Sequence, residues 1–192
     1  MTIKIGINGF GRMGRLALRS AWSNSDVEFV QINDPAGDAA TLAHLLTFDS
    51  VHGRWSEEAT ADGNDIVIGD KRITTTRNKA IADTDWSACD VVIEASGVMK
   101  TKALLQAYLD QGVKRVVVTA PVKEEGVLNI VMGVNHNLYK SFSAFARARR
   151  SGGVGKGKLT TCCRFMAFSC STIPSRGICN NSGSINSGKS LS

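Results

Sequence analysis

The first 139 residues contain short apolar runs of the kind that form strands. Residues 3–7 alternate isoleucine with other residues and residues 27–32 form a second apolar stretch, so both segments predict strands. Three continuous runs of valine, isoleucine and methionine follow at 91–93, 116–118 and 130–132. Uninterrupted apolar runs of this length are typical of parallel strands that are buried on both faces.

Apolar residues between these runs recur at helical spacing. The pattern predicts a helix after the glycines at 9–14, a second around Leu42–Leu46, and a third over 103–108 that Gly112 ends. Residues 66–76 predict a hairpin with a glycine at its turn. Strand, helix and strand in repetition indicate an α/β fold of the Rossmann type, with a doubly wound, mainly parallel sheet.

Composition changes abruptly after Tyr139. Residues 1–139 have 14 basic and 17 acidic residues, whereas residues 140–192 have nine basic residues, no acid, 11 serines and seven glycines. The later segment shows no sustained period of 2 or 3.6. We therefore expect residues 1–139 to form the Rossmann-type domain, incomplete at its C-terminal end, and residues 140–192 to be a basic tail that is mostly disordered.

The most specific local pattern is Gly9-Phe10-Gly11-Arg12-Met13-Gly14. It follows a predicted strand and opens a predicted helix, which is the context of a dinucleotide-binding turn. Gly9 permits the tight turn, Gly11 lets the backbone approach a pyrophosphate, and Gly14 lets the helix pack closely on the strand. Free N–H groups at the helix start would bind the phosphate charge.

Asp34 ends the second predicted strand, 20 residues after Gly14. This is the usual place of the acid that accepts hydrogen bonds from the adenosine ribose. A 2′-phosphate there would meet a like charge, at a cost of about 1 kcal/mol in water and several in a partly buried site. The sequence therefore predicts NAD rather than NADP as the cofactor.

Several segments in the same order resemble the glyceraldehyde-3-phosphate dehydrogenase family across about 139 residues. They are residues 6–15, Ile32-Asn33-Asp34-Pro35, residues 48–53, Glu94-Ala95-Ser96-Gly97 and Gly133-Val134-Asn135-His136. Residues 38–43 and 119–123 further resemble a branch of the family that is associated with arsenate resistance.

The resemblance implies a role for each matched position. Arg12 and Met13 would offer backbone N–H groups to the pyrophosphate, and Asp34 would hold the adenosine ribose. Arg77 would lie near the adenine. The rest of the implied cofactor site consists of Ser96, Gly97 and Thr119, which would line the route toward the nicotinamide, and of Asn8, Phe10 and Asn33, which adjoin the matched glycines and acid.

The family resemblance ends near Tyr139. Family members continue to a Ser-Cys-Thr-Thr-Asn segment with the nucleophilic cysteine, a distant histidine base and a second domain that supplies much of a homotetramer. None of these is recognisable in this sequence. We therefore assign no catalytic residue, and expect NAD affinity without dehydrogenase turnover and without most of the tetramer contacts.

Other readings rest on the tail. Thr160-Thr161-Cys162-Cys163 has the wrong order for the nucleophile, the four tail cysteines lack zinc-site spacing, and residues 183–190 match a phosphate-loop pattern without its strand and helix. The alternative function is a marginally folded, non-enzymatic product or an interaction module with a basic tail; nucleic acid is a weaker partner prediction. No predicted membrane span or signal peptide occurs, so we expect a cytoplasmic protein.

Overall fold

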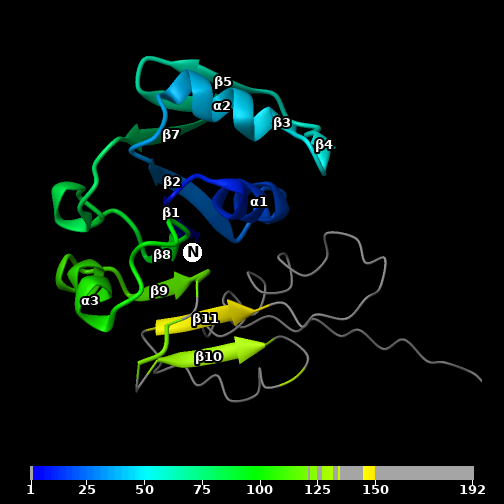
Figure 1. Ribbon diagram of the computed structural model, residues 1–192. Helices are drawn as coiled ribbons and strands as arrows, with labels where there is room; N and C mark the ends of the chain where they lie inside the picture. Colours follow the sequence, from blue (N-terminus) through cyan, green and yellow to red (C-terminus); the bar gives the residue numbers. More distant parts are fainter. Residues whose placement is uncertain (1, 121, 125–126, 132–133, 135–144, 150–192) are drawn as a thin grey trace, which may run out of the picture.

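The computed structural model describes residues 2–120, 122–124, 127–131, 134 and 145–149 (Figure 1). Its longer helices are α1 (Arg12–Ala21), α2 (Ala39–Thr47) and α3 (Lys102–Asp110), with a short 3-10 helix, η1, at Ile81–Asp83. The strands are β1 (Ile3–Asn8), β2 (Val27–Asn33), β3 (Phe48–Asp49), β4 (Gly53–Arg54), β5 (Ala59–Asp62), β6 (Asp65–Ile68), β7 (Lys71–Thr76), β8 (Val91–Glu94), β9 (Arg115–Val118), β10 (Leu128–Val131) and β11 (Phe145–Arg149).

Nine of these strands form one sheet in the order β10-β11-β9-β8-β1-β2-β7-β6-β5. Every neighbouring pair from β10 to β7 is parallel, and only the pairs β7–β6 and β6–β5 are antiparallel. Chain order reverses beside β1, with β2 on one side and β8 on the other. This arrangement confirms the predicted Rossmann-type, mainly parallel α/β fold.

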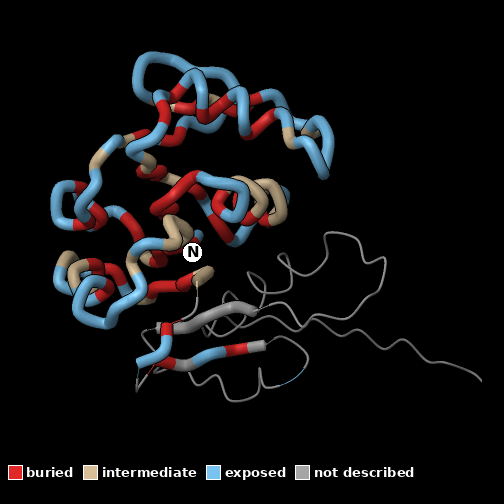
Figure 2. The backbone as a smooth tube through the Cα atoms, in the orientation of Figure 1, coloured by how far each residue is buried: buried red, intermediate tan, exposed pale blue. Residues whose placement is uncertain are grey.

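Helices cover both faces of the sheet, as Figure 1 shows for α1 and α3. Leu18 of α1 and Leu46 of α2 belong to one apolar core, together with Val91 and Ile93 of β8. Val92 of the same strand points the other way, into a second core with the rings of Trp86 and Tyr108. Because both faces are covered, all four residues of β8 are buried, in agreement with the continuous apolar run (Figure 2).

Local signals set the ends of two helices. The Asp38 carboxylate accepts a hydrogen bond from the Thr41 backbone N–H at 2.8 Å and caps α2. The pKa of Asp38 is lowered, first by hydrogen bonding with the Thr41 side chain and then by this backbone hydrogen bond. The Thr101 hydroxyl caps α3 in the same way, and Gly112 follows α3 with a φ of 94°. The predicted glycine end of this helix is thereby confirmed.

The predicted hairpin at residues 66–76 is also confirmed. Strands β6 and β7 pair antiparallel on either side of Gly69, whose φ is 60°. A second hairpin, β5–β6, precedes it and was not predicted. Strand β5, Ala59-Thr60-Ala61-Asp62, alternates only alanine with polar residues and has one buried residue, at its start, so its strand signal is weak.

One segment of the region that was predicted to be mostly disordered has regular structure. Residues 145–149 form β11, which pairs in parallel with β9 and with β10. The alternation Ala146-Arg147-Ala148-Arg149 is a weak strand signal that the surrounding serines, glycines and positive charge obscured. The other residues predicted to belong to the tail, 140–144 and 150–192, lie outside the described residues, as do the phosphate-loop match and the tail cysteines.

Candidate dinucleotide-binding site

The predicted site residues lie where parallel strands end together. Hydrogen bonds connect these ends directly: the Gly9 N–H donates to the Asn33 carbonyl at 2.8 Å, and the Ala95 N–H donates to the Asn8 carbonyl at 2.7 Å. The Thr119 N–H donates to the Glu94 carbonyl at 2.9 Å. In an open α/β sheet, ligands bind outside the carboxyl ends of the strands, at the point where chain order reverses. This point lies beside β1.

The turn from β1 into α1 requires two of its glycines for steric reasons. Gly9 has a φ of +88°, and a Cβ there would lie 2.3 Å from the Ser96 backbone nitrogen. At Gly14 a Cβ would lie 2.4 Å from the Gly9 carbonyl oxygen. These two positions therefore fix how closely the turn packs on β8 and how closely α1 packs on β1, as the motif predicts.

Gly11 differs from the other two glycines of the motif. A Cβ at this position would meet nothing within 4 Å, and the φ of −64° is allowed for any residue. No atom of the described residues thus accounts for the absence of a side chain here. A pyrophosphate against the exposed backbone would account for it, because the Cβ would occupy the space that the phosphate oxygens need.

The start of α1 also lacks the side-chain groups that usually cap a helix. Its N-cap, Gly11, offers no side-chain hydrogen bond, and no acidic residue lies in the first turn. In contrast, α2 and α3 both have a capping side chain. The N–H groups of the first turn of α1, which include those of Arg12 and Met13, are thus left without a capping side chain. They form a place for an anion at the positive end of the helix dipole.

Asp34 lies directly beside this turn. Its Oδ2 accepts a hydrogen bond from the Phe10 backbone N–H at 2.6 Å, and its Oδ1 accepts one from Ala36 at 2.8 Å. The carboxylate is partly exposed, so its remaining lone pairs face solvent. The structure thus brings together the predicted phosphate turn and the predicted ribose acid.

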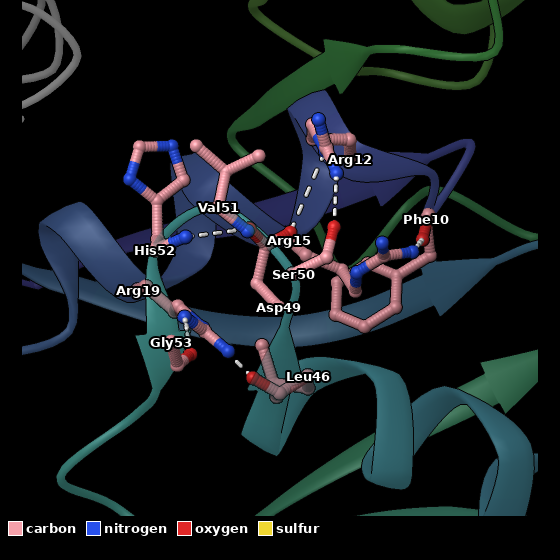
Figure 3. A network of polar contacts seen from close by, with 10 residues as sticks. All are labelled: Phe10, Arg12, Arg15, Arg19, Leu46, Asp49, Ser50, Val51, His52 and Gly53. Atoms are coloured by element: carbon pink, nitrogen blue, oxygen red, sulfur yellow. Dashed lines mark hydrogen bonds and ion pairs between the residues drawn. The ribbon is translucent and has the colours of Figure 1, made fainter.

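Two arginines of α1 fasten the helix to residues 46–53, and a third supports the glycine turn (Figure 3). Arg12 forms an ion pair with Asp49 at 3.5 Å and donates to the Ser50 hydroxyl at 3.0 Å. Arg19 donates to the backbone carbonyls of Leu46 and Gly53. Arg15 donates to the Phe10 carbonyl at 3.0 Å and therefore supports the glycine turn from the helix side; partial burial lowers its pKa.

The Asp49 carboxylate also organises its own loop. It accepts hydrogen bonds from the backbone N–H groups of His52 and Val51, both at 2.9 Å, and these bonds lower the pKa of Asp49. Arg12 therefore reaches away from the glycine turn toward a carboxylate that is already held in place. This geometry leaves the backbone of Arg12, rather than its guanidinium, at the predicted phosphate position.

Sequence reasoning missed a buried polar network beneath the strand ends. Asn33 donates to the Asn8 side-chain oxygen at 2.8 Å and to the Asn78 carbonyl at 2.9 Å, and it accepts from the Thr76 hydroxyl at 2.8 Å. Asn8 in turn donates to Glu94 at 2.7 Å. The network connects the ends of β7, β2, β1 and β8. The sequence pattern that could have indicated this network is a polar residue at the last position of each apolar strand.

The remaining predicted residues lie at either end of this row. Ser96 and Gly97 follow β8 and are partly exposed, and the Thr119 hydroxyl donates to the Glu94 carbonyl at 3.2 Å. Arg77 follows β7 on the far side and is exposed. The structure thus places Arg77 on the Asp34 side of the glycine turn and the other three on the opposite side.

Cys89 is buried, as expected for a small core residue, and is 3% exposed. Burial, together with a smaller contribution from the nearby Asp90, raises the pKa of its thiol to about 12. The buried thiol is favoured in its neutral form, so its contribution to the free energy of unfolding is complete below the unfolded pKa of about 8.5. This contribution is lost as pH rises toward the folded pKa of about 12.

We therefore expect Cys89 in the folded protein to resist iodoacetamide at about pH 8, and to react fully in urea, because only the thiolate is nucleophilic. Peptide mass spectrometry measures labelling at this residue separately from the tail cysteines. The free energy of unfolding should also fall above about pH 9, and less so in Cys89→Ala. Rapid labelling of Cys89 in the folded chain would contradict the assignment.

In the described part of the chain, no helix has the length and apolar character that crossing a bilayer requires. Among the histidines, His44 and His52 are exposed in the α2–β4 region, and His136 lies outside the described residues. His44 packs against the ring of Phe48, with 4.9 Å between ring centroids. Neither of these two described histidines forms a hydrogen bond with the glycine turn.

Comparisons with known proteins agree with the geometry. Residues 3–102 match the family described as glyceraldehyde 3-phosphate dehydrogenase, NAD binding domain. Glyceraldehyde-3-phosphate dehydrogenase 3 of Nostoc sp. is 50% identical over 142 residues, which cover 73% of this chain and 42% of that protein. Glyceraldehyde-3-phosphate dehydrogenase 1 of Bacillus subtilis is 42% identical over 141 residues, 72% of this chain and 42% of that protein.

A third relative, glyceraldehyde-3-phosphate dehydrogenase of Geobacillus stearothermophilus, is 42% identical over 141 residues with the same two coverages, 72% and 42%. The chain thus spans about two fifths of the length of these relatives. The matched family is defined by NAD binding, which confirms the predicted cofactor. With its glycine turn, Asp34 beside that turn and this match over more than half its length, the chain belongs to the glyceraldehyde-3-phosphate dehydrogenase family, as its NAD-binding domain.

Proposed function

We propose that this chain binds NAD across the carboxyl ends of β2, β1, β8 and β9, and that this is its part in the dehydrogenation of an aldehyde. The observation that supports this most directly is the open space beside Gly11, at a helix start without a capping side chain. Nicotinamide, when bound, supplies the hydride acceptor. The residues of this chain bind and orient the dinucleotide.

Each proposed contact has a physical reason. The backbone N–H groups of Arg12 and Met13 face the pyrophosphate, and Asp34 accepts hydrogen bonds from the adenosine ribose. Arg77 lies toward the adenine, on the β7 side of Asp34. Asn8, Phe10 and Asn33 act through the turn: the Phe10 N–H holds Asp34, and the two asparagines hold the strand ends in register.

Titration of the purified chain with NAD tests this proposal. We expect a saturable calorimetric signal and an upward shift of the unfolding temperature with NAD concentration, because a ligand that binds only the folded state stabilises it. ADP-ribose, which lacks nicotinamide, should also bind, since most proposed contacts lie on its half of the cofactor. Absence of any saturable signal from cooperatively folding protein would overturn the proposal.

Asp34→Asn should weaken NAD binding about tenfold. The ratio of the NADP to the NAD dissociation constant should fall by at least about fivefold. The charge that accepts the ribose hydroxyls and repels a 2′-phosphate is lost, and hydrogen bonds to a charged group contribute about 1.5–3 kcal/mol. Calorimetric dissociation constants for both dinucleotides measure this. The matched control is Asp70→Asn, which removes the same charge from an exposed turn at the opposite end of β7.

Three finer predictions stay proposals here. The cytoplasmic location can be measured by fractionation of cells that express the chain. The expected loss of the family's homotetramer contacts can be measured by sedimentation velocity, in which a tetrameric boundary would contradict it. The resemblance of residues 38–43 and 119–123 to the arsenate-associated branch remains a prediction about the oxyanion used by the complete enzyme.

A further inference from the structure

A buried carboxylate lies under the turn that follows β8. Glu94, the last residue of this strand, is 1% exposed. Its Oε2 accepts hydrogen bonds from the Tyr108 hydroxyl at 2.6 Å and from the Asn8 side-chain amide at 2.7 Å. Its Oε1 accepts from the Ser96 backbone N–H at 2.9 Å and from the Ser96 hydroxyl at 2.5 Å.

The partners of Glu94 are arranged for an ionised carboxylate. Both hydroxyls already accept a hydrogen bond from elsewhere: Tyr108 from the Asn8 amide at 2.7 Å, and Ser96 from the Val98 backbone N–H at 3.2 Å. Each hydroxyl proton is therefore free to point at Glu94. Four donors converge on the two oxygens, and an acidic proton on Glu94 would displace one of them.

Among the described residues, this charge has no cationic partner. The ion pairs among the described residues join Arg12 to Asp49, Arg72 to Asp62 and Asp65, and Lys114 to Asp90, and none includes Glu94. Four hydrogen bonds make burial of the carboxylate tolerable but leave its net charge in place. In a low-dielectric interior, the field of such a charge reaches beyond its immediate contacts.

The turn above Glu94 lies on the nicotinamide side of the proposed site. Asp34 and Arg77 lie on the β2 and β7 side of the glycine turn, where the adenosine half belongs. The other half of the dinucleotide must then extend over the ends of β8 and β9, past Ser96 and Thr119. Ser96 contacts Glu94 through both its backbone and its side chain, so the carboxylate lies directly beneath this path.

We propose that Glu94 is a specificity-determining residue that makes this site prefer the oxidised cofactor. The oxidised nicotinamide ring has a positive charge and the reduced ring is neutral, so a buried anion attracts only the former. For a nicotinamide ring about 10 Å from the carboxylate, at an effective dielectric constant of about 20, one unit charge changes the affinity for NAD⁺ relative to NADH by roughly tenfold. This inference rests on the proposed function, because it requires NAD to occupy the site.

The test compares the dissociation constants of NAD⁺, NADH and ADP-ribose by calorimetry. We expect the wild-type chain to bind NAD⁺ more tightly than NADH. In Glu94→Gln, which removes the charge and nearly preserves the volume, the ratio of the NADH to the NAD⁺ dissociation constant should fall roughly tenfold. ADP-ribose has no nicotinamide, so its affinity should change much less than that of NAD⁺.

Tyr108→Phe is the matched control. It removes two hydrogen bonds from the same network but leaves the carboxylate and its charge. A merely structural role of Glu94 predicts that both variants weaken all three ligands alike. A role through charge predicts that only Glu94→Gln changes the NADH to NAD⁺ ratio, with little effect of salt because the charge is buried.

Two results would overturn the inference while leaving the proposed function intact. One is a wild-type chain that binds NADH as tightly as NAD⁺, a measurement that stands even if Glu94→Gln does not fold. The other is a folded Glu94→Gln variant with an unchanged ratio. If neither dinucleotide nor ADP-ribose binds the wild-type chain, the proposed function itself fails.

Discussion

Gly11→Ala is expected to lower NAD affinity about a hundredfold, or about 2.7 kcal/mol, while the unfolding temperature without NAD stays unchanged. The backbone conformation at Gly11 suits any residue, and an added Cβ would contact no protein atom within 4 Å. The methyl group would instead fill the space proposed for the pyrophosphate. Calorimetric titration and thermal unfolding of the variant measure the two effects separately.

Gly9→Ala should do the opposite and destabilise the fold itself. Its Cβ would overlap the Ser96 backbone nitrogen at 2.3 Å, and the φ of +88° is strained for alanine. We expect a loss of at least about 3 kcal/mol in the free energy of unfolding, since neither backbone segment can move without breaking strand hydrogen bonds. Gly63→Ala, with a φ of +60° and open space, controls for the conformational strain alone, at about 1–2 kcal/mol.

The pair therefore separates binding from folding within one motif. If Gly11→Ala destabilised the protein without NAD as strongly as Gly9→Ala does, the space beside Gly11 would have a structural role. If Gly11→Ala bound NAD with wild-type affinity, the pyrophosphate would not lie against this turn.

Asn33→Asp is expected to destabilise the protein by about 3–5 kcal/mol, although the two side chains have nearly the same shape. Asn33 is 2% exposed, and its amide nitrogen donates to the oxygens of Asn8 and Asn78. A carboxylate would place negative oxygen 2.8–2.9 Å from those two acceptors, in a buried place without a cation among its partners. Urea unfolding measures the loss.

The control for this substitution is Asn64→Asp in the β5–β6 turn. Asn64 is exposed and its recorded hydrogen bonds use only its backbone carbonyl, so the same chemical change should alter stability by less than about 0.5 kcal/mol. Equal effects of the two substitutions would mean that the polar network beneath the strand ends contributes nothing specific to the fold.

Much of the fold could be predicted because its signals are local. Residues 91–93 are buried on both faces and are apolar throughout, so the run itself indicates a central parallel strand. The glycines at 9, 11 and 14 and the acid at 34 have spacings set by one turn, one helix and one strand. These distances along the chain are dictated by the geometry of a single β-α-β unit.

Other features depend on contacts between distant segments. Asn8 and Glu94 are separated by 86 residues and Asn8 and Tyr108 by 100, yet their side chains are hydrogen-bonded. No periodic pattern in the sequence predicts such a pair, because the order of strands in the sheet, rather than position in the chain, brings the two residues together. The same holds for β11, whose five residues gain regular structure from their pairing with β9 and β10.

The amino-acid sequence alone thus determined the Rossmann-type architecture, the glycine turn and the choice of NAD, since each is set by residue types within one short unit. Only the tertiary structure decided that Glu94 is buried without a cation among the described residues, that Asp34 holds the glycine turn, and that Gly11 borders space that no described residue fills. These are properties of the space between elements. That space exists only after strands far apart in the chain have paired and the helices have covered both faces of the sheet.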